Sequence, residues 1–202
     1  MTIVDITIGG RESQTLQQRW SHLITVTICI IGMFLGFTLR SRAVNATVIY
    51  VDNEAGIRVA YPQNWLIDDA GDYVFRVRDT SRIGYKTSIQ VSVRPFSAEA
   101  TERNFLNTLT AERSTEFEGY GVLRVDDNYQ MPDGTLAARM DYYFTDRDLN
   151  PALEAVPTVV IAVDILVRRR GQAIILTFRT DSETFDEDLT VFARFLNSVE
   201  FQ

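Results

Sequence analysis

The sequence predicts an α+β domain, an antiparallel sheet covered by helices, preceded by one transmembrane helix. Three patterns support this prediction: an uncharged apolar run near the N-terminus, short segments that alternate apolar and polar residues, and two amphipathic helical segments. After the apolar run the order is strands, helix, strands, helix, which favours an antiparallel sheet with helices packed on it. The chain shows no internal repeat.

The apolar run extends from Leu23 to Leu39 and holds seventeen residues without a charge. At about 1.5 Å per residue it spans roughly 25 Å, which is near the lower limit of the length that crosses the hydrocarbon core of a bilayer. Trp20 before the run, and Arg40 and Arg42 after it, have side chains suited to the headgroup zone. A soluble core helix would need a polar face, which this run lacks. We therefore predict an N-terminal tail over residues 1–20 and a transmembrane helix over residues 21–40.

A cleaved signal peptide is the alternative, because residues 44–46 (Val-Asn-Ala) fit a small-residue cleavage site. The apolar run is longer than the usual ~7–15 residues of a signal peptide, so a retained anchor is favoured. Two arginines lie on each side of the run, and the positive-inside rule does not decide the orientation. Long domains translocate regardless of modest charge, so we expect the domain over residues 47–202 to be extracytoplasmic.

Small residues recur along one side of the predicted transmembrane helix. Thr25, Cys29, Gly32 and Gly36 follow one another at spacings of four, three and four, which places them on one narrow stripe. Small residues let two helix backbones approach closely, and this closeness drives helix association in lipid. The stripe predicts a helix-packing surface, although glycine is common in membrane helices for other reasons.

The rest of the chain alternates between strand patterns and turns. Strands are predicted at residues 47–51, 57–61, 73–78, 87–93, 122–129, 136–145, 158–169 and 172–179. Pro62 ends the second strand because proline cannot donate to a ladder, and Gly134 and Gly171 mark tight turns. Residues 146–157 are expected to form a loop.

Two helices are predicted among these strands. The first runs from about residue 98 to 117, with Ser97 as its N-cap and Gly119 closing it. The second begins at a capping box formed by Thr184 and Glu187. Its apolar residues recur at helical spacing, which predicts an amphipathic helix packed on the sheet: Phe185, Leu189, Phe192, Phe195, Leu196 and Val199.

Two segments resemble those of a known family. The run GIRVAYPQNW at residues 56–65 resembles the opening strand and Tyr-Pro-x-x-Trp turn of PsbP-like domains, and residues 192–201 resemble the closing helix of that superfamily. The resemblance covers residues 47–202. It implies an α/β/α sandwich with a central antiparallel sheet, in a superfamily whose members, including Ran-binding nucleotide-release factors and small bacterial envelope proteins, are mostly non-catalytic binding or assembly modules.

The sequence departs from the extrinsic photosystem subunits of that superfamily in its retained anchor and in a domain without histidine, so metal-retention roles are not carried over. The single histidine, His22, and the single cysteine, Cys29, lie in the predicted transmembrane region. Nucleophilic and zinc chemistry that depends on these residue types is therefore excluded in the domain. A calcium-like run at Asp146 is interrupted by Pro151 and Pro157. We expect no catalytic, cofactor-binding or metal site, and an enzyme using carboxylates alone stays a minor alternative.

The chain is acidic overall but contains one cluster of three consecutive arginines. The chain has net charge −7, which disfavours nucleic acid as a partner because the surplus needed to neutralise phosphates is absent. Arg168, Arg169 and Arg170 top the last hairpin, where they can contact anionic lipid or an acidic partner. The alternative for this triplet is a solvated hairpin end.

These observations favour a non-catalytic, membrane-anchored accessory or assembly subunit of a larger membrane protein complex of the photosynthetic or respiratory kind. Its expected partners are the lipid bilayer and other integral membrane subunits. The alternative is a tethered envelope domain that binds a small lipid or solute in a cleft.

Overall fold

The computed structural model describes residues 16–44, 46–82, 84–97, 99–147 and 157–202. The chain divides into two units, residues 1–45 and 46–202, each described by itself. The elements are α1 (Leu16–Val44), β1 (Thr47–Asp52), β2 (Ile57–Pro62), β3 (Leu66–Asp68), β4 (Phe75–Arg78), β5 (Ser88–Pro95), α2 (Glu102–Glu116), β6 (Glu118–Gln130), β7 (Leu136–Asp146), β8 (Thr158–Arg169), β9 (Gln172–Asp181), α3 (Phe185–Asn197) and β10 (Glu200–Phe201).

The first unit contains α1, whose side chains from Trp20 to Arg42 are all exposed. This stretch is long and apolar enough to cross a membrane by length and composition, a criterion that an N-terminal signal sequence also meets. Its threonine hydroxyls donate to carbonyls of the preceding turn, Thr25 to Ser21 at 2.9 Å and Thr27 to Leu23 at 2.8 Å. The hydroxyls are therefore satisfied inside the helix, as a hydrocarbon environment requires.

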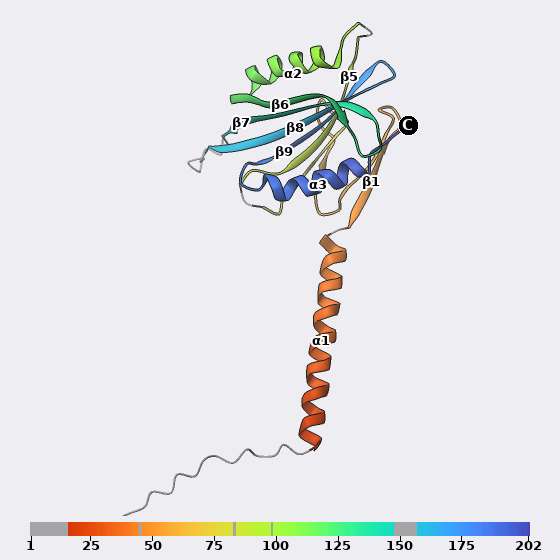
Figure 1. Ribbon diagram of the computed structural model, residues 1–202, viewed down its shortest axis with the longest axis vertical. Helices are drawn as coiled ribbons and strands as arrows, with labels where there is room; N and C mark the ends of the chain where they lie inside the picture. Colours follow the sequence, from red (N-terminus) through yellow and green to blue (C-terminus); the bar gives the residue numbers. More distant parts are fainter. Residues whose placement is uncertain (1–15, 45, 83, 98, 148–156) are drawn as a thin grey trace, which may run out of the picture. The chain divides into compact units, whose positions relative to one another are not determined.

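The second unit is built on a seven-stranded sheet in the order β3-β4-β5-β9-β8-β7-β6, with every neighbouring pair antiparallel. Helices α2 and α3 lie on opposite faces of this sheet (Figure 1). A smaller antiparallel sheet, β1-β2-β10, packs on the α3 side. The predicted fold class, an antiparallel sheet covered by helices, is confirmed.

The core consists of two apolar clusters, one on each face of the large sheet. Along β8, Val163 and Ile165 contribute to the cluster under α3, whereas Ala162 and Leu166 contribute to the cluster under α2. Because both faces are covered, β8 and β9 have nearly continuous apolar sequences instead of a simple alternation.

The stripe predicted on the last helix packs as expected, because Phe192 and Phe195 are buried and Phe192 stacks on Phe178 at 4.8 Å. The predicted capping box is wrong. The hydroxyl of Thr184 makes no capping bond, because it donates instead to the carboxylate of Asp188 at 2.8 Å.

The start of α2 also differs from the prediction. The helix begins at Glu102, after Thr101, whose hydroxyl oxygen accepts the N–H of Asn104 at 3.2 Å. Ser97 lies outside the helix, so the better-placed threonine supplies the cap. At the other end, Phe117 is already extended and Gly119, with φ of 63°, belongs to β6. The short strands β3 and β10 have no alternating pattern long enough to predict.

Candidate functional site

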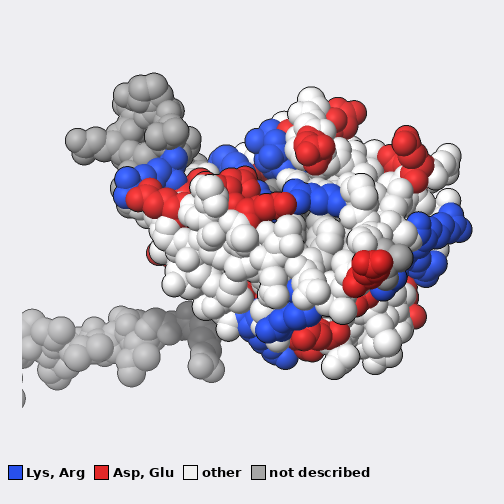
Figure 2. Space-filling view, turned by 90° about the horizontal axis from the view of Figure 1, so that it is seen from above, with Lys and Arg blue, Asp and Glu red and all other residues white. Residues whose placement is uncertain are grey.

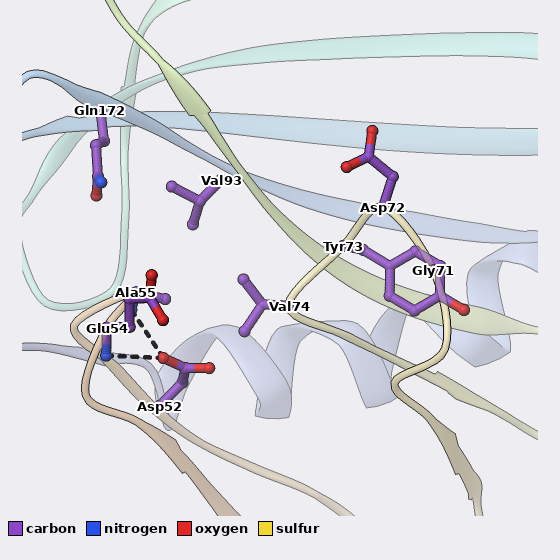
Figure 3. A pocket seen from close by; sticks show the side chains of 9 residues that line it. All are labelled: Asp52, Glu54, Ala55, Gly71, Asp72, Tyr73, Val74, Val93 and Gln172. Carbon is purple, nitrogen blue, oxygen red and sulfur yellow. Dashed lines mark hydrogen bonds between the residues drawn. The ribbon is translucent and has the colours of Figure 1, made fainter.

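An open cleft of about 430 Å³ lies at one end of the domain. Four segments form it: the turn between β1 and β2, the loop between β3 and β4, the last residues of β5 and the first residue of β9. Its lining residues are Asp52, Glu54, Ala55, Gly71, Asp72, Tyr73, Val74, Val93 and Gln172 (Figure 3). None of them was predicted as a site residue, and we refer to this feature as the acid-rimmed cleft.

The β1–β2 turn supplies the first carboxylates. One oxygen of Asp52 accepts the N–H groups of Glu54 at 2.9 Å and Ala55 at 2.8 Å, which holds the turn closed. Gly56 then takes a φ of 63°, a conformation that favours glycine. The turn leaves the carboxylate of Glu54 exposed.

The β3–β4 loop forms the opposite wall. A Cβ added at Gly71 would lie 2.2 Å from a ring carbon of Tyr73, so a side chain there would displace the Tyr73 ring. The guanidinium of Arg76 lies over this ring, 4.9 Å from its centre. In Figure 3, Asp72 stands on this wall, while Gln172 extends toward the β1–β2 turn on the other side. The carboxylate of Asp72 is exposed.

The floor of the cleft is apolar, and its surroundings are negative. Val74 and Val93 lie half-buried at the floor. Tyr50 lies next to the floor, and its hydroxyl donates to the carbonyl of Val74 at 3.3 Å. Burial raises the pKa of Tyr50, and the negative charges of Asp52 and Asp69 raise it further. Burial is the larger cause of this shift, and the two carboxylates place negative charge beside the cleft.

The arrangement suits binding of a cationic or polar group better than metal coordination. Within the part of the chain that the structure describes, no three His, Cys, Asp or Glu side chains are grouped so that they can hold a metal ion. The absence of catalytic, cofactor and metal sites stays a prediction.

No protein-family model matches the sequence, and no curated protein sequence matches it. Solved structures do resemble it. The cyanobacterial PsbP (CyanoP) of Synechocystis sp. PCC 6803 matches with a TM-score of 0.55 at 16% identity, covering 78% of this chain and 93% of its own. The domain has the PsbP-like fold. The Ran-binding protein Mog1p of Saccharomyces cerevisiae matches with a TM-score of 0.50 at 8% identity, covering 77% of this chain and 95% of its own.

The arginine triplet lies near the cleft, but the structure does not gather it into one patch. The guanidinium of Arg168 stacks over Phe96 at 4.8 Å, on the α2 side of the PsbP-like domain. That of Arg169 lies over the ring of Phe201 at 5.3 Å. Arg170 occupies the turn itself, with a φ of 48°. The three arginine side chains therefore lie in three different environments. Their contact with lipid or a partner stays a prediction.

Two of these arginines border the cleft on its far side. Arg169 and Arg170 line a small cavity of about 30 Å³ that shares Glu54, Ala55 and Gln172 with the acid-rimmed cleft. Neither guanidinium forms an ion pair with Glu54 among the described residues. Positive charge therefore adjoins the cleft on its Glu54 side, while no arginine or lysine is among the residues that line the cleft itself.

The predicted helix-packing stripe lies on an open surface of α1. Thr25, Cys29, Gly32 and Gly36 are all exposed. A Cβ added at Gly32 or at Gly36 would meet nothing within 4 Å. The two glycines therefore form a shallow backbone groove, and its occupation by another helix stays a prediction.

Proposed function

We propose that the protein is a non-catalytic, membrane-anchored accessory or assembly subunit of a larger membrane protein complex, with its PsbP-like domain on the extracytoplasmic side. The observation that carries this proposal is α1, whose apolar side chains are exposed around the whole helix and whose glycine stripe is open. An expected complex is one of the photosynthetic or respiratory kind. Mog1p is itself a Ran-binding protein, which supports this fold as a protein-binding module.

The physical basis of the proposal is close helix packing in lipid. Hydrocarbon tails solvate apolar side chains as well as a neighbouring helix does, so burial alone does not hold membrane helices together. At Gly32 and Gly36 a second backbone can approach closely enough for dispersion contacts and weak Cα–H···O bonds. The stripe therefore gives α1 a side that favours a partner helix over lipid.

The test replaces both glycines in the full chain, as Gly32→Ile and Gly36→Ile. Isoleucine keeps the segment apolar, so the chain still reaches the membrane, but its β-branched bulk fills the groove. We expect the variant to be lost from the complex after extraction in mild detergent, measured by native gel electrophoresis and mass spectrometry of the co-purified chains.

A matched control places the same bulk on the opposite side of α1. Thr27 and Thr38 lie about 200° around the helix from the stripe, at about 100° per residue. The double variant Thr27→Ile and Thr38→Ile should co-purify as the parent does. If the glycine variant also co-purifies fully, α1 is only a tether and the subunit proposal loses its main support.

A tethered domain that binds a small solute is the second candidate, and the acid-rimmed cleft favours it specifically. About 430 Å³ lies within the range of small-ligand sites. The three rim carboxylates disfavour an anionic lipid headgroup there. Native mass spectrometry separates the two candidates: a lone monomer carrying a bound small molecule supports the solute binder, and a large complex supports the subunit.

A further inference from the structure

The acid-rimmed cleft brings together three carboxylates from two separate segments of the chain. Directly beside the cleft, Arg76 pairs with Asp68 at 2.6 Å. Figure 2 shows acidic and basic groups side by side over one face of the molecule. Among the described residues, no ion pair involves Asp52, Glu54 or Asp72. Three carboxylates without an ion-pair partner among the described residues therefore line the cleft, on opposite sides of Val74.

The chemistry of the cleft selects among possible occupants. The described carboxylates are not grouped to hold a metal ion, so a lone divalent cation is a poor match. An anionic lipid headgroup has the wrong charge. The side chains of Val74 and Val93 favour contact with an aliphatic chain, whereas the carboxylates of the rim favour a cationic group at the end of that chain. Arginine and lysine side chains have this combination, because a long apolar stem carries a charged head.

We propose that the acid-rimmed cleft binds a basic, arginine- or lysine-bearing extramembrane segment of a partner protein. This inference rests on the proposed function, because it names the chemistry of a partner subunit. The stem of the basic side chain packs on the floor at Val74 and Val93. Its charged head meets the carboxylates of Glu54 and Asp72, and the amide of Gln172 is exposed nearby to hydrogen-bond the segment.

Charge over longer distances acts in the same direction. The whole chain has net charge −7, and Asp69 adds its negative charge to the surroundings of the cleft. Complementary charge accelerates encounter and discourages acidic partners, and its effect weakens as salt screens it. Binding of the basic segment should therefore depend strongly on ionic strength.

The experiment uses the full chain in an uncharged detergent and a fluorescent peptide of sequence Ala-Arg-Ala-Arg-Ala-Arg. The cleft variant combines Glu54→Gln and Asp72→Asn, two exposed positions whose exchange leaves the core intact. The control variant combines Glu99→Gln and Glu116→Gln, exposed carboxylates of equal charge that do not line the cleft. We expect the dissociation constant to rise about fivefold to tenfold in the cleft variant and to stay within about twofold in the control.

Two outcomes overturn the inference. Equal weakening in both variants means that the peptide binds the acidic surface at large, and an unchanged constant in the cleft variant means that the cleft is not the site. Native gels of the same proteins test the proposed function separately. A parent chain that runs in a large complex yet ignores the peptide refutes only the inference, whereas a parent that runs alone but binds the peptide at the cleft refutes only the subunit proposal.

Discussion

The two faces of the seven-stranded sheet are closed in different ways. On the α3 face, buried aromatic rings fill the space, with Phe178, Phe192 and Phe195 in contact. On the α2 face, the apolar cluster surrounds a buried ion pair between Arg113 and Asp164.

The α3 face also holds a buried charge, because the carboxylate of Asp188 lies 3.0 Å from a guanidinium nitrogen of Arg82 and accepts the hydroxyls of Thr87 and Thr180. The two faces therefore differ in how deeply the arginine of each ion pair lies: the side chain of Arg113 is 9% exposed and that of Arg82 is 32% exposed.

The polar contacts of the α2 face form a small network. A guanidinium nitrogen of Arg113 lies 2.8 Å from a carboxylate oxygen of Asp164, and another donates to the hydroxyl of Tyr142. The hydroxyl of Thr177 donates to the second oxygen of Asp164 at 2.7 Å. Burial is the main cause that raises the pKa of Tyr142, so its hydroxyl stays protonated. Desolvation offsets much of the attraction in such a pair, so it fixes position more than it adds stability.

The largest effect is expected on the α3 face. Phe192→Ala removes a fully buried ring that stacks on Phe178 at 4.8 Å, and the void cannot collapse completely between helix and sheet. The free energy of unfolding should fall by about 3–5 kcal/mol. Urea unfolding of the full chain in detergent measures this through the fluorescence of buried Trp65, in a Trp20→Phe background. A loss below about 1 kcal/mol would mean that the stripe faces a solvent-filled space.

On the α2 face, breaking the ion pair should cost nearly as much as losing the ring. Arg113→Met leaves the carboxylate of Asp164 buried without its cation, and we expect a loss of about 3 kcal/mol by the same unfolding measurement. The double variant Arg113→Met and Asp164→Leu removes both charges and should recover most of that loss. Additive losses in the double variant would show instead that the network stabilises the α2 face outright.

The features that sequence patterns predicted are those set by local periodicity. The apolar spacing of Phe192 and Leu196 and the hairpin around Gly171 require only neighbours along the chain, and they were located correctly. Nothing local connects Arg113 with Asp164, which lies in the middle of an apolar strand. That partnership arises only when β8 passes beneath α2.

The acid-rimmed cleft escaped prediction for a related reason. Asp52 and Glu54 lie in a turn of the small sheet, and Asp72 lies in a loop of the large one. Considered alone, each segment is an ordinary acidic turn, in which a glycine indicates the turn: Gly56 in the first and Gly71 in the second. Only the packing of the two sheets brings these turns to opposite sides of Val74. A search of the sequence for turns rich in acidic residues would have selected both segments, but it would not have shown that they lie close together in the fold.

The smallest expected effect concerns acid stability at the edge of the large sheet, where the α2 face reaches solvent. The hydrogen bond from Arg76 is the main cause that lowers the pKa of Asp68, from 3.8 to about 2. Because the folded state favours the ionised carboxylate, its contribution to stability is complete above about pH 4 and is lost as the pH falls toward 2. In Asp68→Asn, the melting temperature should therefore fall less steeply over this range than in the parent.

The control Asp69→Asn removes a neighbouring exposed carboxylate without an ion pair among the described residues, and its melting temperature should fall as steeply as that of the parent. Equal slopes in all three proteins would show that water screens the half-buried pair with Arg76 as fully as it screens many surface ion pairs, and that charge matters on the α2 face only where the sheet is fully buried.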